Sequence, residues 1–455
     1  MALIRSGYAS VVVEDPPATL LEGLRRFRRD EDGRGEYENL YSLSFDGKTL
    51  VTAPGFVKRV MELCPGGRFR NERRPMPKPN KEAATSGLDK FWEGIVANAV
   101  DSCGGIVCIP EALGDIDMAA AILRAFPHEA LLERGLPMSV VAVPDDEMAR
   151  AVVSKLQAAF PNRDIGHVTA RRYSDADDIL VTTYGSLKNL SFQPVGVFIA
   201  CGLSGTDVTP YVESISTIRN AARWGIFSTP LGDVPDEDMT LEGLFGEVVA
   251  AAKYSDAVKA GAMVPVTVCW LHAPEPSMFG RGPFELIEAN AMQNNPRFCD
   301  LVADIVRNVP SDIGVIVNTN KRAMADSLTK RVNGLVTYDR QVPPAQRRAI
   351  RNDIMDGVIR RAVASFDVPL LSSHGVMILA SCEGRSVAAK RVPWRKKVGP
   401  RDRAFIIDFD HSWDIHNGRP GYLARNDNAR AMRYQELGFR QMSLDSVNQL
   451  PFIGG

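Results

Sequence analysis

The feature that most constrains the fold is a series of short Val/Ile-rich runs, each followed by a segment with helical periodicity. The runs GIVCIP (residues 105–110) and MSVVAVP (residues 138–144) precede helical segments at residues 117–126 and 145–160. Similar runs follow at residues 177–187, 195–202 and 221–230. Apolar strands that alternate with helices are typical of a parallel sheet covered on both faces. We therefore predict an α/β domain here.

A second series of the same kind begins near residue 285. Its helical patterns lie at residues 295–309, 320–332 and 426–439, and its strand-like runs at residues 312–319, 334–339, 374–381 and 403–409. The predicted fold class is thus α/β, with two tandem domains of parallel sheet. The predicted boundaries are residues 76–280 for the first α/β domain and residues 281–455 for the second.

The first 75 residues have a different pattern and predict a small α+β accessory domain. Residues 17–32 (PATLLEGLRRFRRDED) are expected to be helical, and residues 41–53 strand-like. Asp46-Gly47 lies between two alternating runs and predicts a hairpin turn. Residues 71–84, rich in Pro and basic residues, have the composition of a linker to the next domain.

Composition and charge exclude several classes of protein. The chain has 455 residues and a formal net charge of −1, so its overall charge does not draw it to nucleic acid or to an anionic membrane. Its seven cysteines show no C-x-x-C spacing, which argues against a zinc site and fits a reducing compartment. With no signal peptide and no long apolar run, we expect no membrane contact and a cytoplasmic location.

The order of these pieces resembles superfamily-2 helicases, in particular DEAH-type translocases related to phage branch-migration helicases and to the XPB type. The resemblance covers about residues 75–440. Residues 105–122 fall where the family has its phosphate loop, and "RWGIFSTP" (residues 223–230) is similar to the family's "RLGLTATP". The segments at residues 140–152, 177–187, 241–271, 402–411 and 429–439 match further family segments in the same order. The resemblance implies two RecA-like domains.

At the position of the family's phosphate loop, the chemistry that ATP needs is missing. A phosphate loop uses a Lys to neutralise the β- and γ-phosphates and a Ser or Thr to hold Mg²⁺. The resemblance puts Asp115 at the Lys position and Ile116 at the Thr position. A carboxylate at about 4 Å from a phosphate charge costs about 4 kcal/mol at an effective dielectric near 20.

Two further catalytic clusters of the family are also replaced. The Asp and Glu of its DEAH motif, which hold Mg²⁺ and position the attacking water, match Ala200 and Cys201. We interpret Cys201 as a buried thiol rather than a nucleophile. The Gly-Arg of the arginine-finger motif matches Val392-Pro393, although Arg391 or Arg395 could replace the finger after a slip of one or two residues.

Two basic stretches could bind nucleic acid or an acidic protein. Residues 385–403 hold eight basic residues and one acid. The nucleic-acid contacts predicted in this segment are Lys390, Arg391, Trp394, Arg395, Lys396 and Lys397. The second cluster comprises Arg68, Arg70, Arg73, Arg74, Lys78 and Lys81. Phosphate contacts would come from the basic groups, and Trp394 could stack on a base.

Other positions have a functional and a structural interpretation. Tyr184 and Ser186 lie where the family touches the nucleic-acid backbone, or else form a strand-end turn. Ser228 and Thr229 match the positions that couple nucleotide state to domain motion, or else cap a strand end. Residues 408–416 (DFDHSWDIH) contain three Asp and two His and could suggest a metal, but we expect no metal site in the chain.

The sequence therefore predicts a catalytically inactive helicase-like protein, a pseudo-helicase, that binds nucleic acid or scaffolds a larger assembly. The phage-type resemblance suggests a phage-related protein in the host cytoplasm or the virion, with a protein partner and with DNA or RNA as a possible ligand. No cofactor is expected. One alternative is an active helicase with divergent motifs that uses ATP and Mg²⁺. The other is a purely structural component, for example of a virion.

Overall fold

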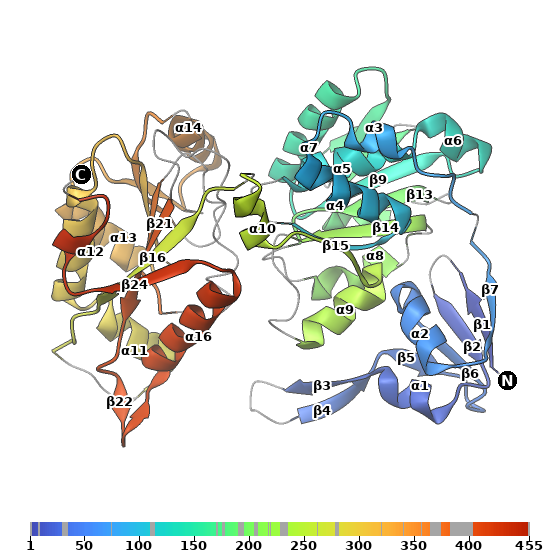
Figure 1. Cartoon of the computed structure of the whole chain (residues 1–455), viewed down its shortest axis with the longest axis horizontal. Coiled ribbons are helices and arrows are strands. Elements are labelled where there is room, and N and C mark those ends of the chain that lie inside the picture. Colours follow the sequence, from blue (N-terminus) through green and yellow to red (C-terminus); the bar gives the residue numbers. More distant parts are fainter. Residues whose placement is uncertain are drawn as a thin grey trace. The chain divides into compact units, whose positions relative to one another are not determined.

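The computed structural model of the chain divides into two compact units, Met1–Ala252 and Lys253–Gly455 (Figure 1). The structure describes residues 2–7, 10–29, 35–73, 75–109, 114–169, 172–174, 178–189, 195–203, 208–216, 218, 220–227, 235–261, 263–277, 282–319, 321–339, 341–355, 357–364, 375–382 and 404–453. Each unit contains one large sheet, and the first also carries a smaller N-terminal sheet. The fold class is therefore the predicted one.

The large sheet of the first unit has the strand order β11-β10-β12-β9-β13-β14-β8-β15. All neighbours pair in parallel except the short edge strand β11. Its strands are β8 (Gly105–Cys108), β9 (Met138–Val143), β10 (Ile165–Thr169), β11 (Arg172–Ser174), β12 (Ile179–Thr183), β13 (Val195–Ala200), β14 (Asn220–Phe227) and β15 (Val248–Ala251). The accompanying helices are α3 (Lys81–Thr85), α4 (Lys90–Asp101), α5 (Asp115–Ala125), α6 (His128–Glu133), α7 (Asp146–Ala159), α8 (Val212–Ser216) and α9 (Pro235–Phe245).

Alternate residues of these strands supply two hydrophobic cores. In β8, Val107 belongs to the core shared with α4, α5 and α7, whereas Ile106 and Cys108 belong to the core shared with α8 and α9. Successive side chains of a strand point to opposite faces, so a strand that is apolar at every position must be covered on both sides. The continuous Val/Ile runs of the sequence have this physical origin.

The second unit has a seven-stranded sheet in the order β18-β19-β17-β20-β21-β16-β24, with every pair parallel. Its strands are β16 (Val266–His272), β17 (Val315–Asn318), β18 (Val336–Tyr338), β19 (Arg361–Ala364), β20 (Val376–Leu379), β21 (Ala404–Asp410) and β24 (Arg440–Leu444). Its helices are α10 (Tyr254–Lys259), α11 (Phe284–Ala291), α12 (Pro296–Asn308), α13 (Arg322–Arg331), α14 (Pro344–Met355) and α16 (Tyr422–Glu436). A short hairpin joins β22 (Ile415–His416) to β23 (Arg419–Pro420).

The predicted boundary between residues 280 and 281 falls inside this second unit. Strand β16 precedes that boundary, yet it pairs with β21 and β24 in the second sheet. An apolar strand carries no local signal of which sheet it will join. Its pairing with partners more than a hundred residues away decides that.

The N-terminal segment forms a five-stranded mixed sheet in the order β5-β6-β2-β1-β7. Its elements are β1 (Leu3–Ser6), β2 (Val11–Glu14), β5 (Tyr41–Leu43), β6 (Thr49–Thr52), β7 (Arg68–Asn71), α1 (Ala18–Gly23) and α2 (Val57–Leu63). The predicted hairpin turn is confirmed: β5 and β6 pair antiparallel, and Gly47 at the turn has a φ of 70°. A positive φ suits glycine because it has no Cβ.

The helix predicted over residues 17–32 is correct only in its first half. Helix α1 ends at Gly23, and the next residues form strand β3 (Arg25–Arg29), which pairs antiparallel with β4 (Gly35–Asn39). The helix ends at Gly23 and is capped by Leu24. The residues that follow pair with strand β4 instead of continuing the helix. The hairpin of β3 and β4, here called the ribbon, is a separate two-stranded sheet.

Candidate functional site

The position of the family's phosphate-loop Lys lies at the first residue of α5. Strand β8 leads toward Gly114, which precedes the helix with a φ of 79°. A Cβ at Gly114 would lie 2.6 Å from Asp117 Oδ2, so the turn requires glycine. Asp115 and Asp117 occupy the first turn, where the helix dipole favours negative charge. Two carboxylates thus lie at the helix end that would otherwise attract a phosphate.

Strand β13 brings the DEAH-like position to the same place. Its last residue, Ala200, is followed by Cys201 and Gly202, and the Gly202 N–H donates to Asp115 Oδ2 at 2.7 Å. Cys201 Sγ also lies 3.9 Å from the Asp115 carbonyl oxygen. The predicted motif positions Asp115 and Cys201, 86 residues apart in the chain, are therefore neighbours. They meet because β8 and β13 run parallel and end at the same edge of the sheet.

The Asp115 carboxylate is only half satisfied. Oδ2 accepts the Gly202 N–H, whereas Oδ1 is buried and has no hydrogen-bond partner among the described residues. Burial raises the pKa of Asp115 from 3.8 to about 6, although the hydrogen bond from Gly202 opposes the shift. Within the described part of the chain, no cation pairs with this acid. Lys155 instead pairs with Asp117, at 3.3 Å.

The other two family positions offer no chemistry for ATP. Ile116 is partly buried and packs against the core shared with α4 and α7. Ala200 is fully buried in the core on the opposite face of the sheet. Neither side chain has a group that could hold Mg²⁺, so these two described positions offer no ligand for the metal of a nucleotide.

Cys201 is the buried thiol that we predicted. Its side chain is inaccessible to solvent, and burial raises the pKa of the thiol well above its ordinary value. The nearby Asp115 charge acts in the same direction. A thiol that stays protonated is a poor nucleophile.

Tyr184 packs as an internal residue beside the same strand end. Its hydroxyl donates to the Cys201 carbonyl at 2.6 Å, and its ring lies 5.5 Å from that of Tyr211. The side chain is fully buried, so in this structure it offers no surface to a nucleic acid. Ser186, also buried, exchanges a hydrogen bond of 2.9 Å with Thr183, which fits the strand-end turn.

Several predicted site residues lie outside the described residues, and their roles stay predictions. They are Ser228, Thr229, Lys390, Arg391, Val392, Pro393, Trp394, Arg395, Lys396 and Lys397.

The second basic cluster separates into exposed and structural residues. Arg68, Arg70 and Lys78 are exposed. Arg73 donates to the carbonyl oxygens of Gly7 and Pro54, at 2.9 and 3.2 Å, and thereby ties the end of β7 to its surroundings. The remaining described member, Lys81, pairs with Asp101. The cluster is therefore not one continuous set of available cations.

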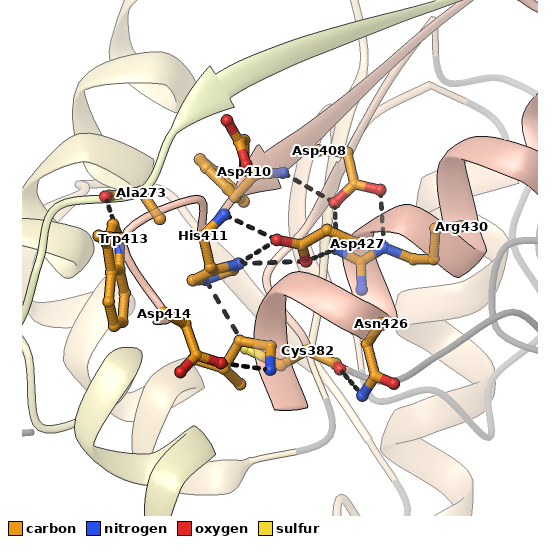
Figure 2. Close-up of polar contacts among 12 residues, drawn as sticks. Ala273, Cys382, Asp408, Asp410, His411, Trp413, Asp414, Asn426, Asp427 and Arg430 are labelled. Carbon is orange, nitrogen blue, oxygen red and sulfur yellow. Dashed lines mark hydrogen bonds and ion pairs between the residues drawn. The ribbon is translucent and has the colours of Figure 1, made fainter. Parts of the chain in front are cut away.

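A buried ion network lies at the carboxyl edge of the second sheet (Figure 2). Arg430 of α16 donates to both oxygens of Asp408 at 2.9 Å and to Asp427 at 2.8 Å. The Tyr434 hydroxyl donates to Asp408 at 2.8 Å. Burial disfavours the charge on Arg430, but the two carboxylates outweigh it and raise the pKa of the guanidinium.

His411 extends this network toward β20. Its ring Nδ1 lies 3.1 Å from Asp427 Oδ2, and its backbone N–H donates to the same oxygen at 2.7 Å. Its Nε2 lies 3.7 Å from Cys382 Sγ. Cys382 also donates its N–H to Glu288 and accepts from Asn426 at its carbonyl. Every polar group of Cys382 is thus engaged.

Cys382, His411 and Asp427 have the order of a nucleophile, base and acid, but the site lacks access. Cys382 and His411 are both fully buried, and burial raises the pKa of the Cys382 thiol well above its ordinary value. The arrangement instead locks α16 to the ends of β20 and β21. Among the described residues, no group of three His, Cys, Asp or Glu side chains is placed to hold a metal.

Residues 408–416 suggested at most a metal in the sequence, and this network was not predicted. Its other half, Asp427 and Arg430, lies on α16, which was interpreted only as an amphipathic helix. Three charged residues on the buried face of α16, Asp427, Arg430 and Arg433, were the available signal.

Comparisons with known proteins address the fold. No protein-family model and no curated protein matches the chain. S. cerevisiae Dbp5 bound to RNA and ADP BeF3 is similar over 80% of this chain and 92% of its own, with a TM-score of 0.53 and 10% identity. A fragment of a putative HsdR subunit of a type I restriction enzyme from Vibrio vulnificus YJ016 is similar over 96% of this chain and 78% of its own, with a TM-score of 0.58 and 10% identity.

The chain therefore shares the fold of these two structures, two tandem α/β domains with parallel sheets. T4 UvsW is similar over 97% of this chain and 99% of its own, with a TM-score of 0.40 and 13% identity. None of the described helices is both long and apolar enough to cross a membrane.

Proposed function

We propose that this chain is a catalytically inactive helicase-like protein that binds nucleic acid or scaffolds a larger assembly. The observation that carries the proposal is Asp115. Its carboxylate stands at the N-terminus of α5 and is bonded to the Gly202 N–H, where the helicase fold would place a Lys and a phosphate. The phage-type resemblance suggests a phage-related assembly with a protein partner.

The electrostatics at this edge support the loss of nucleotide binding. Placing a phosphate charge about 4 Å from ionised Asp115 costs about 4 kcal/mol at an effective dielectric near 20, a factor of about a thousand in affinity. The Gly202 N–H, a donor that could serve an anion, is already used by Asp115. Ala200 and Cys201 provide no carboxylate for Mg²⁺.

The test is a calorimetric titration of the full chain with ATP and Mg²⁺, together with an assay of phosphate release. We expect neither binding nor hydrolysis. A second titration uses the variant Asp115→Lys combined with Ile116→Thr, Ala200→Asp and Cys201→Glu, in which any ATP affinity should appear for the first time. Asp117→Asn is the matched control, because Asp117 is exposed on the same helical turn.

Saturable binding of ATP by the wild-type chain, weakened by Asp115→Ala but not by Asp117→Asn, would overturn the proposal. That result would favour an active ATPase with divergent motifs.

Nucleic-acid binding is tested separately, by the salt dependence of affinity for DNA and RNA. Replacing Lys390, Arg391, Arg395 and Lys396 with Ala should weaken binding and reduce the salt dependence. If the wild-type chain binds neither at physiological salt but co-purifies with a protein partner, the scaffolding role remains and the nucleic-acid role is excluded.

A further inference from the structure

We propose that the N-terminal sheet joins copies of this chain head to tail, with the β5–β6 hairpin tip of one copy bound to the outer face of the sheet in the next. This inference rests on the scaffolding form of the proposed function and deepens it, because it names a second copy of the chain as the protein partner. The interface lies entirely in the accessory domain.

The N-terminal sheet has one covered face and one open face. Helices α1 and α2 pack on the covered face (Figure 1), where Ile4 of β1 and Val13 of β2 are buried. Their neighbours Leu3 and Val12 are partly exposed, and burial alternates in this way along both strands. Because successive side chains of a strand point to opposite faces, Leu3 and Val12 belong to an outer face that is open to solvent.

The strand register gives the composition of this outer face. Side chains that share the face pair across β7, β1, β2 and β6 in two rows, Arg70-Arg5-Val12-Val51 and Arg68-Leu3-Glu14-Thr49. The apolar members of these rows lie on β1, β2 and β6, and the arginines lie on β1 and on the edge strand β7. The outer face thus combines an apolar surface with a basic edge.

The arginines of β7 are poorly compensated. The exposed guanidinium of Arg68 has no partner among the described residues. Arg70 has only an exposed contact of 3.9 Å with Glu72, whereas Arg5 pairs with Glu14 at 2.9 Å. Arg70 also lies directly opposite Arg5, and like charges at opposite positions of paired strands are destabilising. An acid from a partner would therefore be favoured at this edge.

The β5–β6 hairpin ends in a turn that presents an aromatic ring. Phe45 is fully exposed, and its ring has no aromatic or cationic contact among the described residues. The Gly47 N–H donates to the Ser44 carbonyl at 2.9 Å, and the Ser44 hydroxyl donates to Asp46 Oδ1 at 2.6 Å. A ring held on a hydrogen-bonded turn is suited to anchor an interface, because the turn has little further order to gain on binding.

Asp46 places a negative charge beside this ring. The hydrogen bonds from the Ser44 hydroxyl and from the Lys48 N–H, the latter at 3.1 Å, lower the pKa of the Asp46 carboxyl. The carboxylate is therefore ionised at neutral pH. The hairpin tip offers an apolar ring followed directly by an acid.

The tip and the outer face are complementary in chemistry. Phe45 supplies an apolar ring for Leu3 and Val12, and Asp46 supplies a carboxylate for Arg68. The tip lies at the β5–β6 edge of the sheet, and β7 is the opposite edge. A contact between two different surfaces leaves one of each unused in every pair of copies, so it builds an open row of subunits.

A second copy fits these surfaces better than a nucleic acid does. Phosphates would use the arginines but would be repelled by Glu14 on the same face. They would also leave Leu3, Val12 and the exposed Phe45 ring without a role. In a second copy, both the apolar side chains and the charges have a matching partner.

The test is sedimentation velocity of the full chain over a range of concentrations. We expect species that grow beyond a dimer as the concentration rises. Phe45→Ala should weaken association about tenfold or more, and Arg68→Glu with Arg70→Glu should weaken it by reversing the charge of the β7 edge. Met61→Ala is the matched control, since Met61 is an exposed apolar residue on α2, on the covered side of the sheet. Thermal melts check that every variant is folded.

Mixing the two variants gives the sharpest result. The Phe45→Ala chain keeps an intact outer face, and the charge-reversed chain keeps an intact tip. An equimolar mixture should therefore form a heterodimer that grows no further, although each variant alone associates weakly.

A wild-type chain that stays monomeric would overturn the inference, as would a Phe45→Ala chain that associates like the wild type or a mixture without a heterodimer. An equal loss in Met61→Ala would overturn it as well. If the charge-reversed variant loses affinity for DNA or RNA but associates normally, the arginines serve nucleic acid and the interface fails. Head-to-tail association in a chain that binds ATP would defeat the proposed function alone, whereas a monomer that binds no ATP would defeat only this interface.

Discussion

Acids are buried near the carboxyl edges of both large sheets, but only in the second unit are they paired with a cation. Both place acids where buried strands end. In the second unit, Asp408 and Asp427 share Arg430, so both of these acids are paired with a cation. In the first unit, Asp115 has one backbone N–H and no cation among the described residues, and its pKa is raised to about 6. Paired acids lock a structure together, whereas a lone buried acid destabilises it.

This difference between the two edges bears on the function of Asp115. A lone buried acid is rarely kept for stability, and strongly perturbed groups concentrate at functional positions. In the proposed function, the first edge corresponds to a nucleotide site, and its acid opposes an anion. The second edge serves architecture, since it connects α16 to β20 and β21. Four predictions test the contrast, from the largest expected effect to the smallest.

The largest effect is expected from Arg430→Ala in the second unit. Removing the cation leaves Asp408 and Asp427 buried without compensation, which should lower the free energy of unfolding by about 3–5 kcal/mol. Arg425→Ala on the same helix is the control, because Arg425 is exposed and should change stability by less than about 0.5 kcal/mol. Urea unfolding, assigned to the second unit by hydrogen exchange of peptides from α16, measures both. Equal effects would contradict a dominant role for the network.

The second prediction concerns pH and Asp115. Its pKa in the folded chain, about 6, lies above the ordinary 3.8, so the folded state binds the proton more tightly than the unfolded state does. The free energy of unfolding should therefore fall by up to about 3 kcal/mol as the pH rises from about 4 to 6, and this contribution should stay constant above that range.

Asp115→Asn should remove this fall and stabilise the first unit at pH 7, because Asn keeps an acceptor without the charge. Asp117→Asn should leave the fall in place. Urea unfolding across this pH range, assigned by exchange of peptides from α5, measures both variants. A fall that persists in Asp115→Asn would assign it to another group.

A smaller effect is expected from Gly202→Ala. Gly202 has a φ of 69°, and a Cβ would lie 2.8 Å from Met148 Sδ and 2.9 Å from Pro144 Cδ. The positive φ alone costs an alanine about 1–2 kcal/mol, and the close contacts add to it. Gly185→Ala is the control, since it has an open surrounding and no positive φ. If both variants unfold at the same urea concentration, the packing of Gly202 against Pro144 and Met148 is looser than described.

The smallest effect is expected from Cys382→Ala. The thiol lies 3.7 Å from His411 Nε2, and the bond between them is weak. The loss should be about 1 kcal/mol, well below that of Arg430→Ala. A loss as large as that of Arg430→Ala would show that the thiol is an essential part of the network.

The fold could be predicted largely from local patterns. The helix expected over residues 295–309 is α12, Pro296–Asn308, which buries Phe298, Val302 and Val306 on one face. That spacing is visible in the sequence because it depends only on the geometry of one helix. Strand β3 was missed for the complementary reason: its structure depends on pairing with β4, and no local pattern separated it from the helix before it.

The candidate site was predictable in part. The sequence pointed to Asp115, Ala200 and Cys201 through the order of strands and helices, and the structure brings these positions together. It could not indicate that Tyr184 would be buried beneath them. It also could not reveal that Arg430 would pair with Asp408, because that contact depends on how α16 packs across β21.

By itself, the sequence determined the residue types at each strand end and the alternation of strands and helices, because both are written in short-range periodicity. Tertiary structure alone decided that the Gly202 N–H is donated to Asp115, that β16 joins the second sheet, and that Arg26 of the ribbon donates to Thr240 on α9. These outcomes depend on strand order and packing between segments far apart in the chain. Local periodicity carries no information about which distant partner a buried charge or strand will meet.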